Sequence, residues 1–343
     1  MARRPTIADV AREAGVSVAT VDRVLNGRHR VRDETSRRVY EAAQKIGYHA
    51  SSVIKQRIFA DLPEYRLGFV LHKEKQDFYQ VFATELERAV RAAPNIRGHV
   101  TIAFAASQTP DDIAKLIESV GRKVQAVAAT ALDHHAVTSA VAELKAKGVP
   151  TFSLLSDYAQ GVRESYVGTN NLRVGRTAGW LVSKAAGRTG KVAIFVGGHR
   201  FHGHQLRETG FRSYFREFAP RFEVLDTLVN LETRQLTYEA TLDLLSRHPD
   251  LVGFYCAGGG MEGAIAAVRE IRQHDDLAVV VNEVTPDSRA GLLDRYVTAV
   301  LATPLLRLCP DLVSLMVNTI QHGPAETPGQ HFLGAEIYVP ESL

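Results

Sequence analysis

The sequence is poor in features that several protein classes need. Its two cysteines, Cys256 and Cys309, could form one disulfide, but both lie in apolar surroundings, where two free thiols fit a reducing compartment better. No run of about 18 apolar residues is present, which excludes a membrane span. The N-terminus, MARRPTIADVAREAG, lacks the apolar core of a signal peptide. We therefore expect a cytoplasmic protein with no membrane partner.

Motifs for catalysis are also missing. The chain contains neither a G-x-S-x-G nucleophile elbow nor a phosphate-binding P-loop, and the spacing of its Asp, His and Ser residues singles out no nucleophile. One stretch does suggest a cofactor, because CAGGGMEG, residues 256–263, has the G-x-G-x-x-G spacing of dinucleotide-binding turns. Glu283 follows where a ribose-binding carboxylate would lie. The turn comes late in the chain, however, so an NAD-dependent enzyme is only an alternative, and we expect no cofactor and no catalytic residue.

Net charge is low, at +3, but it is unevenly distributed. Residues 1–60 carry 12 Lys/Arg against 6 Asp/Glu, whereas the remainder carries 29 against 32. A basic N-terminal segment on a mildly acidic body suggests a polyanionic partner for that segment. The 343 residues allow two or three domains, and the hydrophobic share of 45% is that of an ordinary globular protein.

The first 60 residues have the pattern of short helices. Three are predicted, over 7–14, over 18–25 and from a cap at Asp33 up to Gly47. Thr6 and Ser17 can cap the first two, and Gly15 between them allows a tight reversal with little room for a Cβ. Two helices of this size around a glycine turn make a helix-turn-helix. The second helix has an apolar face for the core and an opposite face that suits the major groove of DNA.

From Tyr65 onward, strand-like runs alternate with helix-like runs, as in RLGFVLH followed by FATELERAVRAA. This alternation predicts parallel β-α-β units with helices on both faces of the sheet, and about 280 residues of them fit two doubly wound subdomains better than one. We therefore predict an all-α helix-turn-helix headpiece and an α/β body of two parallel-sheet subdomains. The expected ranges are 1–49 for the headpiece, 50–64 for a linker and 65–343 for the body, with subdomain crossings near 163, 285 and 320.

The segment PTIADVAREAGVSVATVDRVLNGRHR resembles the N-terminus of the lactose-repressor (LacI/GalR) family of bacterial transcription regulators. The family pattern T-I-x-D-V-A-x-x-A-G-V-S-x-x-T-V-S-R-V-L-N is matched almost throughout, and the resemblance extends over the whole chain. It implies a body like the type I periplasmic sugar-binding proteins. It also implies a cytoplasmic, nucleoid-associated repressor that binds a near-palindromic operator DNA as a homodimer and responds to a small carbohydrate-like effector in the interdomain cleft.

The resemblance assigns roles on DNA residue by residue. Val18, Ala19 and Arg23 match base-reading positions. Arg23 could pair bidentately with a guanine, whereas Val18 and Ala19 offer apolar contact, for instance to a thymine methyl. The positions that match phosphate-contacting or capping residues are Thr6, Ser17, Thr20 and Asn26.

Two positions depart from the family pattern. Asp22 stands where the family has Ser, and its carboxylate could repel phosphate, accept from a cytosine amine, pair with a neighbouring Arg or point into solvent. We expect an operator unlike the family average. In the linker, the family's minor-groove Leu falls on Arg57, with Ile58 beside it. Either Ile58 wedges into the groove after a one-residue shift, or Arg57 reads a narrow groove electrostatically.

Ligands of open α/β sheets bind beyond the carboxyl ends of the strands, and this rule selects candidate effector residues. Aromatic rings beside carboxylates, amides and Arg suit a sugar, which offers a flat face and paired hydroxyls. The candidates are His72, Phe78, Tyr79, Asp133, His134, His202, Arg207, Gly258, Gly259, Met261, Asn282, Glu283 and Thr303.

The family resemblance gives some of these candidates specific roles. It implies that Phe78 and Tyr79 sandwich the sugar ring and that Asp133 and Arg207 bind hydroxyls. Gly258-Gly259 stands where the family has Asn-Asp, so we expect these glycines to leave room for a larger or differently held effector. A packing role is the alternative for each single His or aromatic residue.

Two further alternatives involve metal and transport. HRFHGH, residues 199–204, holds three histidines that could suit zinc, but it lacks the i,i+4 spacing of a hydrolytic metal helix and a nearby Cys, so we expect no metal. A transport-type sugar-binding protein would fit the body, although neither the N-terminal motif nor the missing signal peptide agrees with it. The C-terminal GAEIYVPESL lacks heptad leucines, which argues against a tetramer.

Overall fold

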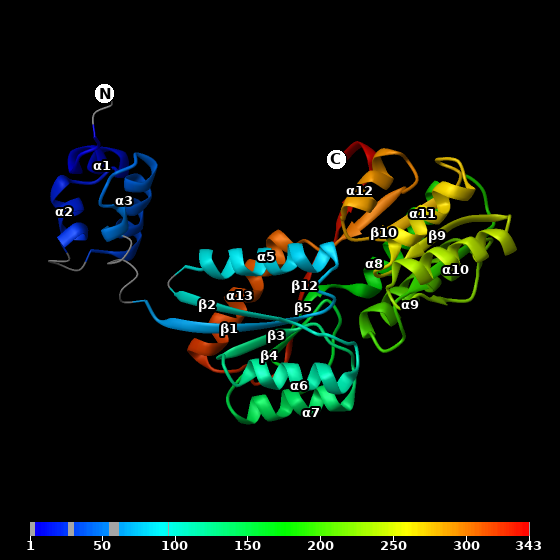
Figure 1. The fold of residues 1–343 in the computed structure, drawn as a ribbon, viewed down its shortest axis with the longest axis horizontal. Helices are drawn as coiled ribbons and strands as arrows, with labels where there is room; N and C mark the ends of the chain where they lie inside the picture. Colours follow the sequence, from blue (N-terminus) through cyan, green and yellow to red (C-terminus); the bar gives the residue numbers. More distant parts are fainter. Residues whose placement is uncertain (1–3, 27–30, 55–61, 95, 343) are drawn as a thin grey trace. The chain divides into compact units, whose positions relative to one another are not determined.

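The computed structural model describes residues 4–26, 31–54, 62–94 and 96–342 (Figure 1). Contacts between Cα atoms divide the chain into two compact units, which are described separately below. The first comprises Met1–Tyr65 with Ala93–His99, and the second comprises Arg66–Ala92 with Val100–Leu343. The two candidate minor-groove residues of the linker, Arg57 and Ile58, lie outside the described residues.

The first unit is built on three helices. They are α1 (Ile7–Ala14), α2 (Val18–Asn26) and α3 (Asp33–Lys45). The structure confirms that Thr6 caps α1, because its hydroxyl accepts from the Asp9 amide and the Asp9 carboxylate accepts from the Thr6 amide at 2.9 Å. Gly15 ends α1 in the left-handed region, at φ 63°, where a residue with a Cβ would be strained.

The turn between α1 and α2 is held by side chains as well as by glycine. Ser17 accepts from the Thr20 amide at 3.1 Å, as expected of a cap on α2. Arg38 on α3 donates to the carbonyl oxygen of Ala14 at 2.7 Å, which ties the third helix to the end of the first. A small apolar core lies beneath these contacts. It contains Val10, Ala11, Ala14, Val21, Val24, Val39, Ala42, Ala43, Tyr48 and Ile54.

The second unit contains two sheets, each covered by helices on both faces. The first sheet has the strand order β12 (Gly329–Leu333), β5 (Ser165–Thr169), β4 (Thr151–Leu154), β3 (Ala126–Ala129), β1 (Glu64–Leu71) and β2 (Arg97–Phe104). One face carries α5 (Asp77–Ala92) and α13 (Leu305–His322), and the other carries α6 (Pro110–Gly121) and α7 (His135–Ala146) (Figure 1). The central strands β3, β4 and β5 are wholly buried, as expected of a parallel sheet covered on both sides, whereas the edge strands β2 and β12 are partly exposed.

The second sheet follows the same plan. Its order is β13 (Glu336–Tyr338), β11 (Ala299–Ala302), β10 (Ala278–Asn282), β9 (Leu251–Cys256), β6 (Lys191–Val196) and β7 (Glu223–Val224), with β8 (Leu228–Val229) also paired to β6. The pair α8 (Asn171–Ala185) and α9 (His202–Phe218) packs together, as does the pair α10 (Arg234–Arg247) and α11 (Met261–Ile271). The remaining elements are α12 (Pro286–Leu293) and the short helix Pro340–Ser342. The predicted two-subdomain α/β fold is confirmed.

The chain crosses between the two sheets three times. The first crossing follows β5, the second follows β11, and the third lies between β12 and β13. The crossings therefore lie close to residues 170, 303 and 334, so the expected positions near 285 and 320 are wrong. The reason is pairing: β11 pairs with β10, and β12 pairs with β5, so both strands are completed before the chain leaves their sheets.

Candidate functional site

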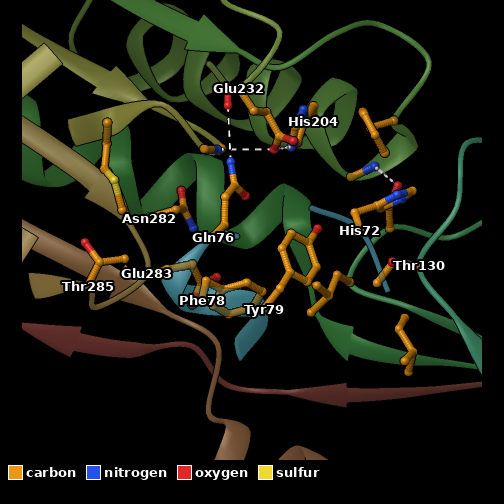
Figure 2. Close-up of a pocket in the computed structure, with 18 of the residues that line it drawn as sticks. His72, Gln76, Phe78, Tyr79, Thr130, His204, Glu232, Asn282, Glu283 and Thr285 are labelled. Carbon is orange, nitrogen blue, oxygen red and sulfur yellow. Dashed lines mark hydrogen bonds and ion pairs between the residues drawn. The ribbon is translucent and has the colours of Figure 1, made fainter. Parts of the chain in front are cut away.

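A pocket opens in the second unit at the carboxyl ends of strands from both sheets (Figure 2). Its volume, including the part that opens to solvent, is about 800 Å³. Nine of the thirteen predicted effector residues line it. They are His72, Phe78, Tyr79, Arg207, Gly258, Gly259, Met261, Asn282 and Glu283.

The other four predicted effector residues do not line this pocket. Asp133 is exposed, and His134 turns back to accept from the Ala136 amide at the start of α7. His202 begins α9 outside the pocket lining, and Thr303 lies behind Glu283. These four assignments are corrected because the strand-end rule selects the loop, whereas the direction of each side chain depends on the local backbone.

Aromatic side chains form one wall of the pocket. Phe78 and Tyr79, at the start of α5, lie beside each other with ring centroids 5.2 Å apart, and Figure 2 shows both at the pocket edge. His72, at the end of the first strand, meets Tyr79 and Phe201 edge-on, at centroid distances of 6.2 Å and 5.8 Å. The wall thus offers apolar faces on which a sugar ring can stack.

His72 is the most unusual group in this wall. Its side chain is buried, with 1% exposed, and neither ring nitrogen has a hydrogen-bond partner among the described residues. Burial lowers the pKa of His72 to about 4, so the imidazole is neutral at pH 7. A neutral imidazole needs one acceptor and one donor, and a buried polar group left without either is costly. A bound hydroxyl would satisfy either nitrogen.

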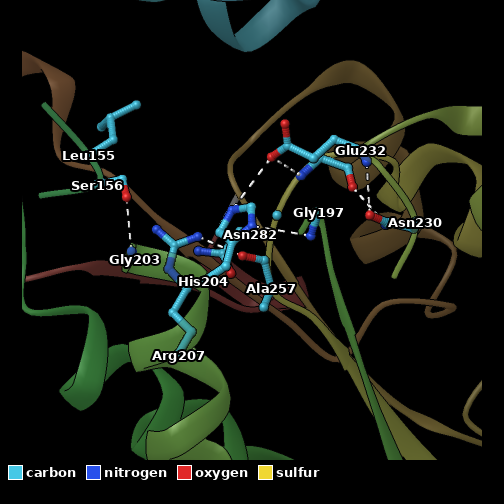
Figure 3. Close-up of polar contacts among 12 residues, drawn as sticks. Leu155, Ser156, Gly197, Gly203, His204, Arg207, Asn230, Glu232, Ala257 and Asn282 are labelled. Atoms are coloured by element: carbon cyan, nitrogen blue, oxygen red, sulfur yellow. Dashed lines mark hydrogen bonds and ion pairs between the residues drawn. The ribbon is translucent and has the colours of Figure 1, made fainter. Parts of the chain in front are cut away.

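His204 on α9 is held in one tautomer. Its Nδ1 accepts from the Gly197 amide at 3.1 Å, so the proton of the neutral ring is on Nε2, which lies 3.5 Å from Oε1 of Glu232 (Figure 3). Burial lowers the pKa of His204 to about 4, although Glu232 opposes this shift. At neutral pH His204 therefore directs a fixed N–H toward the Glu232 carboxylate.

Glu232 is the central carboxylate of this site. Burial alone would raise its pKa, but attraction to His204 and Lys73 and a hydrogen bond from the Gly259 amide lower that pKa to about 2. The Lys73 ammonium lies 3.3 Å from Oε2. Glu232 is not among the effector residues predicted from the sequence, and it lies three residues beyond the end of the two-residue strand β8.

The loop that carries Glu232 is also held by the opposite subdomain. Lys73 donates to the carbonyl oxygens of Leu231 and Glu232 at 3.1 Å and 3.0 Å, and Gln76 donates to the Glu232 carbonyl at 3.3 Å. Leu231 and Glu232 have φ values of 49° and 51°, a left-handed conformation that costs free energy in residues with a side chain. Such strain concentrates at binding sites, and here it turns the two carbonyls toward Lys73 and Gln76.

Arg207 on α9 holds the backbone at the end of β9 through hydrogen bonds. Its Nε donates to Oδ1 of Asn171 at 2.7 Å, and its Nη1 donates to the carbonyl oxygen of Ala257 at 2.7 Å (Figure 3). Asn171 in turn donates to the Leu155 carbonyl of the first sheet. Arg207 therefore lines the pocket and also fixes the strand end that leads into the glycine turn.

Glu283 and Asn282 are fixed by their own neighbours. Glu283 has φ 65° and accepts from the Thr303 amide and hydroxyl at 2.8 Å and 2.7 Å. Burial raises the pKa of Glu283 in spite of these two donors. Asn282 accepts from the Tyr255 hydroxyl and donates to the Leu301 carbonyl. Thr303 thus acts by positioning Glu283, which explains its place behind the pocket.

The glycine turn after β9 does not leave an empty space. A Cβ on Gly258 would lie 2.9 Å from Nε2 of His204 and 3.0 Å from the Glu232 carboxylate. The expectation that Gly258-Gly259 makes room for a larger effector is therefore corrected: His204 and Glu232 fill that room. The third glycine of the spacing, Gly263, allows close helix packing, because a Cβ there would lie 2.0 Å from the Arg234 carbonyl. A carboxylate on the Gly259 amide also opposes a dinucleotide phosphate at this turn.

On the first unit, α2 presents the predicted DNA-reading residues to solvent. Val21 and Val24 are buried, whereas Val18, Ala19 and Arg23 are exposed, and Val18 has 51% of its surface accessible. Ser17 and Asn26 are also exposed, and Thr20 is half-buried. An exposed apolar side chain beside an exposed arginine suits the edges of base pairs in the major groove.

Asp22 is engaged within α2. Its carboxylate accepts from the Asn26 amide group at 2.6 Å, one helical turn later. None of the four alternatives that the sequence suggested for Asp22 included Asn26 as its partner. The bond keeps the carboxylate on the helix surface and directs the Asn26 side chain along α2.

Replacing Asp22 with serine should therefore change DNA binding in two ways. The Asp22→Ser variant removes a negative charge from the predicted DNA-reading helix and releases the Asn26 amide, so we expect tighter binding at low salt and a changed preference at one base pair of each half-site. Sequence selection from a random DNA pool with both proteins would measure the change. An unaltered consensus would contradict a specificity role for Asp22.

Among the described residues, no cluster of three or more His, Cys, Asp and Glu side chains has the arrangement of a metal site. No helix in the described ranges is long and apolar enough to cross a membrane.

Comparisons with known proteins agree with both units. The model for the periplasmic binding protein domain matches residues 67–318, and the model for bacterial regulatory proteins of the lacI family matches residues 6–51. The chain belongs to the lacI family. It is a DNA-binding transcription regulator whose body has the fold of sugar-binding proteins.

Curated relatives of this lacI-family regulator carry regulator names. It is 25% identical to the HTH-type transcriptional regulator GanR of Bacillus subtilis, over 98% of this chain and 99% of GanR. It is 30% identical to the catabolite control protein A of Priestia megaterium, over 42% of each chain. These relatives are named as regulators and not as enzymes.

Solved structures show the fold of the body. A solute binding protein of an ABC transporter from Burkholderia graminis, in complex with D-arabinose, has a TM-score of 0.73 at 20% identity, over 82% of this chain and 97% of that chain. A periplasmic solute binding protein from Actinobacillus succinogenes with bound D-allose has a TM-score of 0.73 at 17% identity, over 81% and 98%. At these identities the likeness concerns the fold alone.

Proposed function

We propose that this lacI-family regulator is a repressor that binds a near-palindromic operator as a homodimer and is controlled by a monosaccharide-like effector. The exposed row Val18, Ala19 and Arg23 on α2 supports the DNA-binding part. One nine-residue helix reads few bases, so a two-fold dimer on a near-palindrome supplies the missing specificity. The protein acts without catalysis, in the cytoplasm at the nucleoid.

The pocket supports the effector part of the proposal. It combines aromatic faces from Phe78 and Tyr79 with buried polar groups, and His72 has two unused hydrogen-bonding atoms. Because its lining comes from both subdomains, a ligand there favours one relative arrangement of the two sheets over another. The effector then shifts DNA affinity by the difference between its affinities for the two arrangements.

The DNA-binding part is tested by selection from a random DNA pool with the purified full-length protein. We expect recovered sites to contain two related half-sites with a two-fold axis between them. Recovery of a single unrepeated half-site would contradict the dimer, and recovery of random sequence would contradict the regulator proposal itself.

The effector part is tested by a thermal-shift screen with D-arabinose, D-xylose, D-allose, D-tagatose, D-glucose and D-galactose. A ligand at a hundred times its dissociation constant should stabilise the protein by about 2.7 kcal/mol. A stabilising sugar should also change operator affinity in a fluorescence-anisotropy titration. Absence of any shift across the whole panel would contradict a monosaccharide effector and would leave the DNA-binding proposal intact.

A further inference from the structure

The charge on the pocket lining is strongly one-sided. Four carboxylates line it, and they are Asp77, Glu232, Glu262 and Glu283. The guanidinium of Arg207 is the cation of the lining, and Lys73 pairs with Glu232 from just behind it. Since both lining histidines are neutral at pH 7, the carboxylates outnumber the cations even when Lys73 is counted.

The four carboxylates differ in how well they are already satisfied. Glu232 has Lys73, His204 and the Gly259 amide, and Glu283 has both donors of Thr303. Asp77 and Glu262 differ, because each lies in the first turn of a helix, α5 and α11, and the two helices belong to different subdomains. The helix N-terminus favours an anion at each position, but it supplies no counter-ion.

Glu262 is partly buried and lies near other carboxylates, and its pKa reflects both. Its pKa is raised, first by partial burial and then by the charges of Asp287 and Asp77, although Arg234 opposes the shift. Asp287 itself lies in the first turn of α12 and reaches Arg234 only at 3.9 Å. A positive charge placed between Asp77 and Glu262 would relieve this repulsion and would draw the two subdomains together.

A second, independent observation also points to a ligand in this pocket. His72 lines the same pocket, is buried, and has no partner for either ring nitrogen among the described residues. A sugar with an amino group offers both what His72 lacks, a hydroxyl, and what the carboxylates lack, a cation.

We propose that the pocket selects an amino sugar over its neutral counterpart and rejects the corresponding uronic acid, with Glu262 as a specificity-determining residue for the ammonium group. This inference rests on the proposed function, because it names the charge class of the same effector. Glu232 provides a fixed acceptor for the sugar hydroxyls, and His72 provides the ring nitrogens that have no partner among the described residues. Glu262 and Asp77 provide the charge that distinguishes the amine.

The proposal is tested with the full-length protein and matched ligand series on three rings. Glucose, galactose and mannose are each compared with their 2-amino-2-deoxy form, their N-acetylated form and their uronic acid by isothermal titration. On the ring that fits, we expect the amine to bind about fivefold more tightly than the neutral sugar, and the uronic acid to bind at least as much more weakly. The N-acetylated form keeps the nitrogen substituent but carries no positive charge, so it should not bind more tightly than the neutral sugar.

A variant and a matched control identify the residue responsible. Glu262→Gln keeps size and helix position and should remove most of the amine advantage, measured as the ratio of amine affinity to neutral-sugar affinity for the same variant. Glu270→Gln, on the exposed far end of the same helix, should leave the amine advantage intact. A uronic acid that binds more tightly than the neutral sugar, or an amine advantage that survives Glu262→Gln, would overturn this inference alone. If no member of any series binds, both this inference and the monosaccharide effector are overturned.

Discussion

Replacing Arg23 with alanine is expected to weaken operator binding by about ten- to a hundredfold and to relax preference at one base pair of each half-site. Arg23 is exposed on α2, one turn beyond Val18 and Ala19, with the buried Val21 and Val24 on the opposite face. An arginine in this place can bond two acceptors of one guanine, and such a pair contributes about 1–3 kcal/mol of discrimination.

The measurement is fluorescence anisotropy with the selected operator and with a set of single-base variants, all at one salt concentration. Arg247→Ala is the matched control, because Arg247 is an exposed arginine of the body and its loss changes the net charge equally. We expect Arg247→Ala to leave operator affinity almost unchanged. If Arg23→Ala weakened all base variants by the same factor, Arg23 would contact phosphate and not bases.

The second large effect concerns the stability of the body. Arg163→Met should destabilise the protein by about 3–5 kcal/mol, because it leaves the Asp157 carboxylate buried without its partner. Arg163 and Asp157 are 3% and 5% exposed, and two guanidinium nitrogens of Arg163 donate to the two carboxylate oxygens. A third donates to the carbonyl of Gly329 at 2.7 Å, so the variant also loosens β12 beside β5.

Thermal unfolding of the full-length protein measures this loss. Arg176→Met is the control, since Arg176 pairs with Glu217 on the surface, where an ion pair contributes at most about 1 kcal/mol. Equal melting temperatures for the two variants would contradict a buried-pair role for Arg163.

The same pair predicts how stability depends on pH. Burial would raise the pKa of Asp157, but the bonds from Arg163 and Ser153 outweigh burial and lower it. Because the folded-state pKa lies below that of the unfolded chain, this stabilisation is complete above the ordinary carboxyl pKa and is lost as pH falls through the folded-state value. The Arg163→Met variant should lose less stability than the wild type over that acidic range.

Local patterns were sufficient for the parts of the molecule that local interactions build. The capping of α1 by Thr6, the glycine turn and the exposed face of α2 all follow from residues within a few positions of one another. The alternation of strand and helix likewise predicts two α/β subdomains. The crossings near 303 and 334 could not be read in this way, because they depend on which distant strand β11 and β12 pair with.

Local sequence patterns also predicted only some of the side chains that line the pocket. The strand-end rule found Phe78, Tyr79 and Arg207, since each follows a recognisable strand. It missed Glu232, which lies three residues beyond the two-residue strand β8, and it favoured His202 over His204. Only the contacts of His204 with Gly197 and Glu232 show which of the two histidines faces the pocket.

The loop that carries Glu232 divides its tasks between backbone and side chain. Gln76 binds only the backbone carbonyl of Glu232, and Lys73 binds the carbonyls of both Leu231 and Glu232 as well as the carboxylate. The residue at position 232 can therefore change, and with it the chemistry offered to an effector, while most of the bridge between the subdomains persists. A single substitution at this position would therefore alter the ligand chemistry of the pocket and keep the backbone contacts that join the two subdomains.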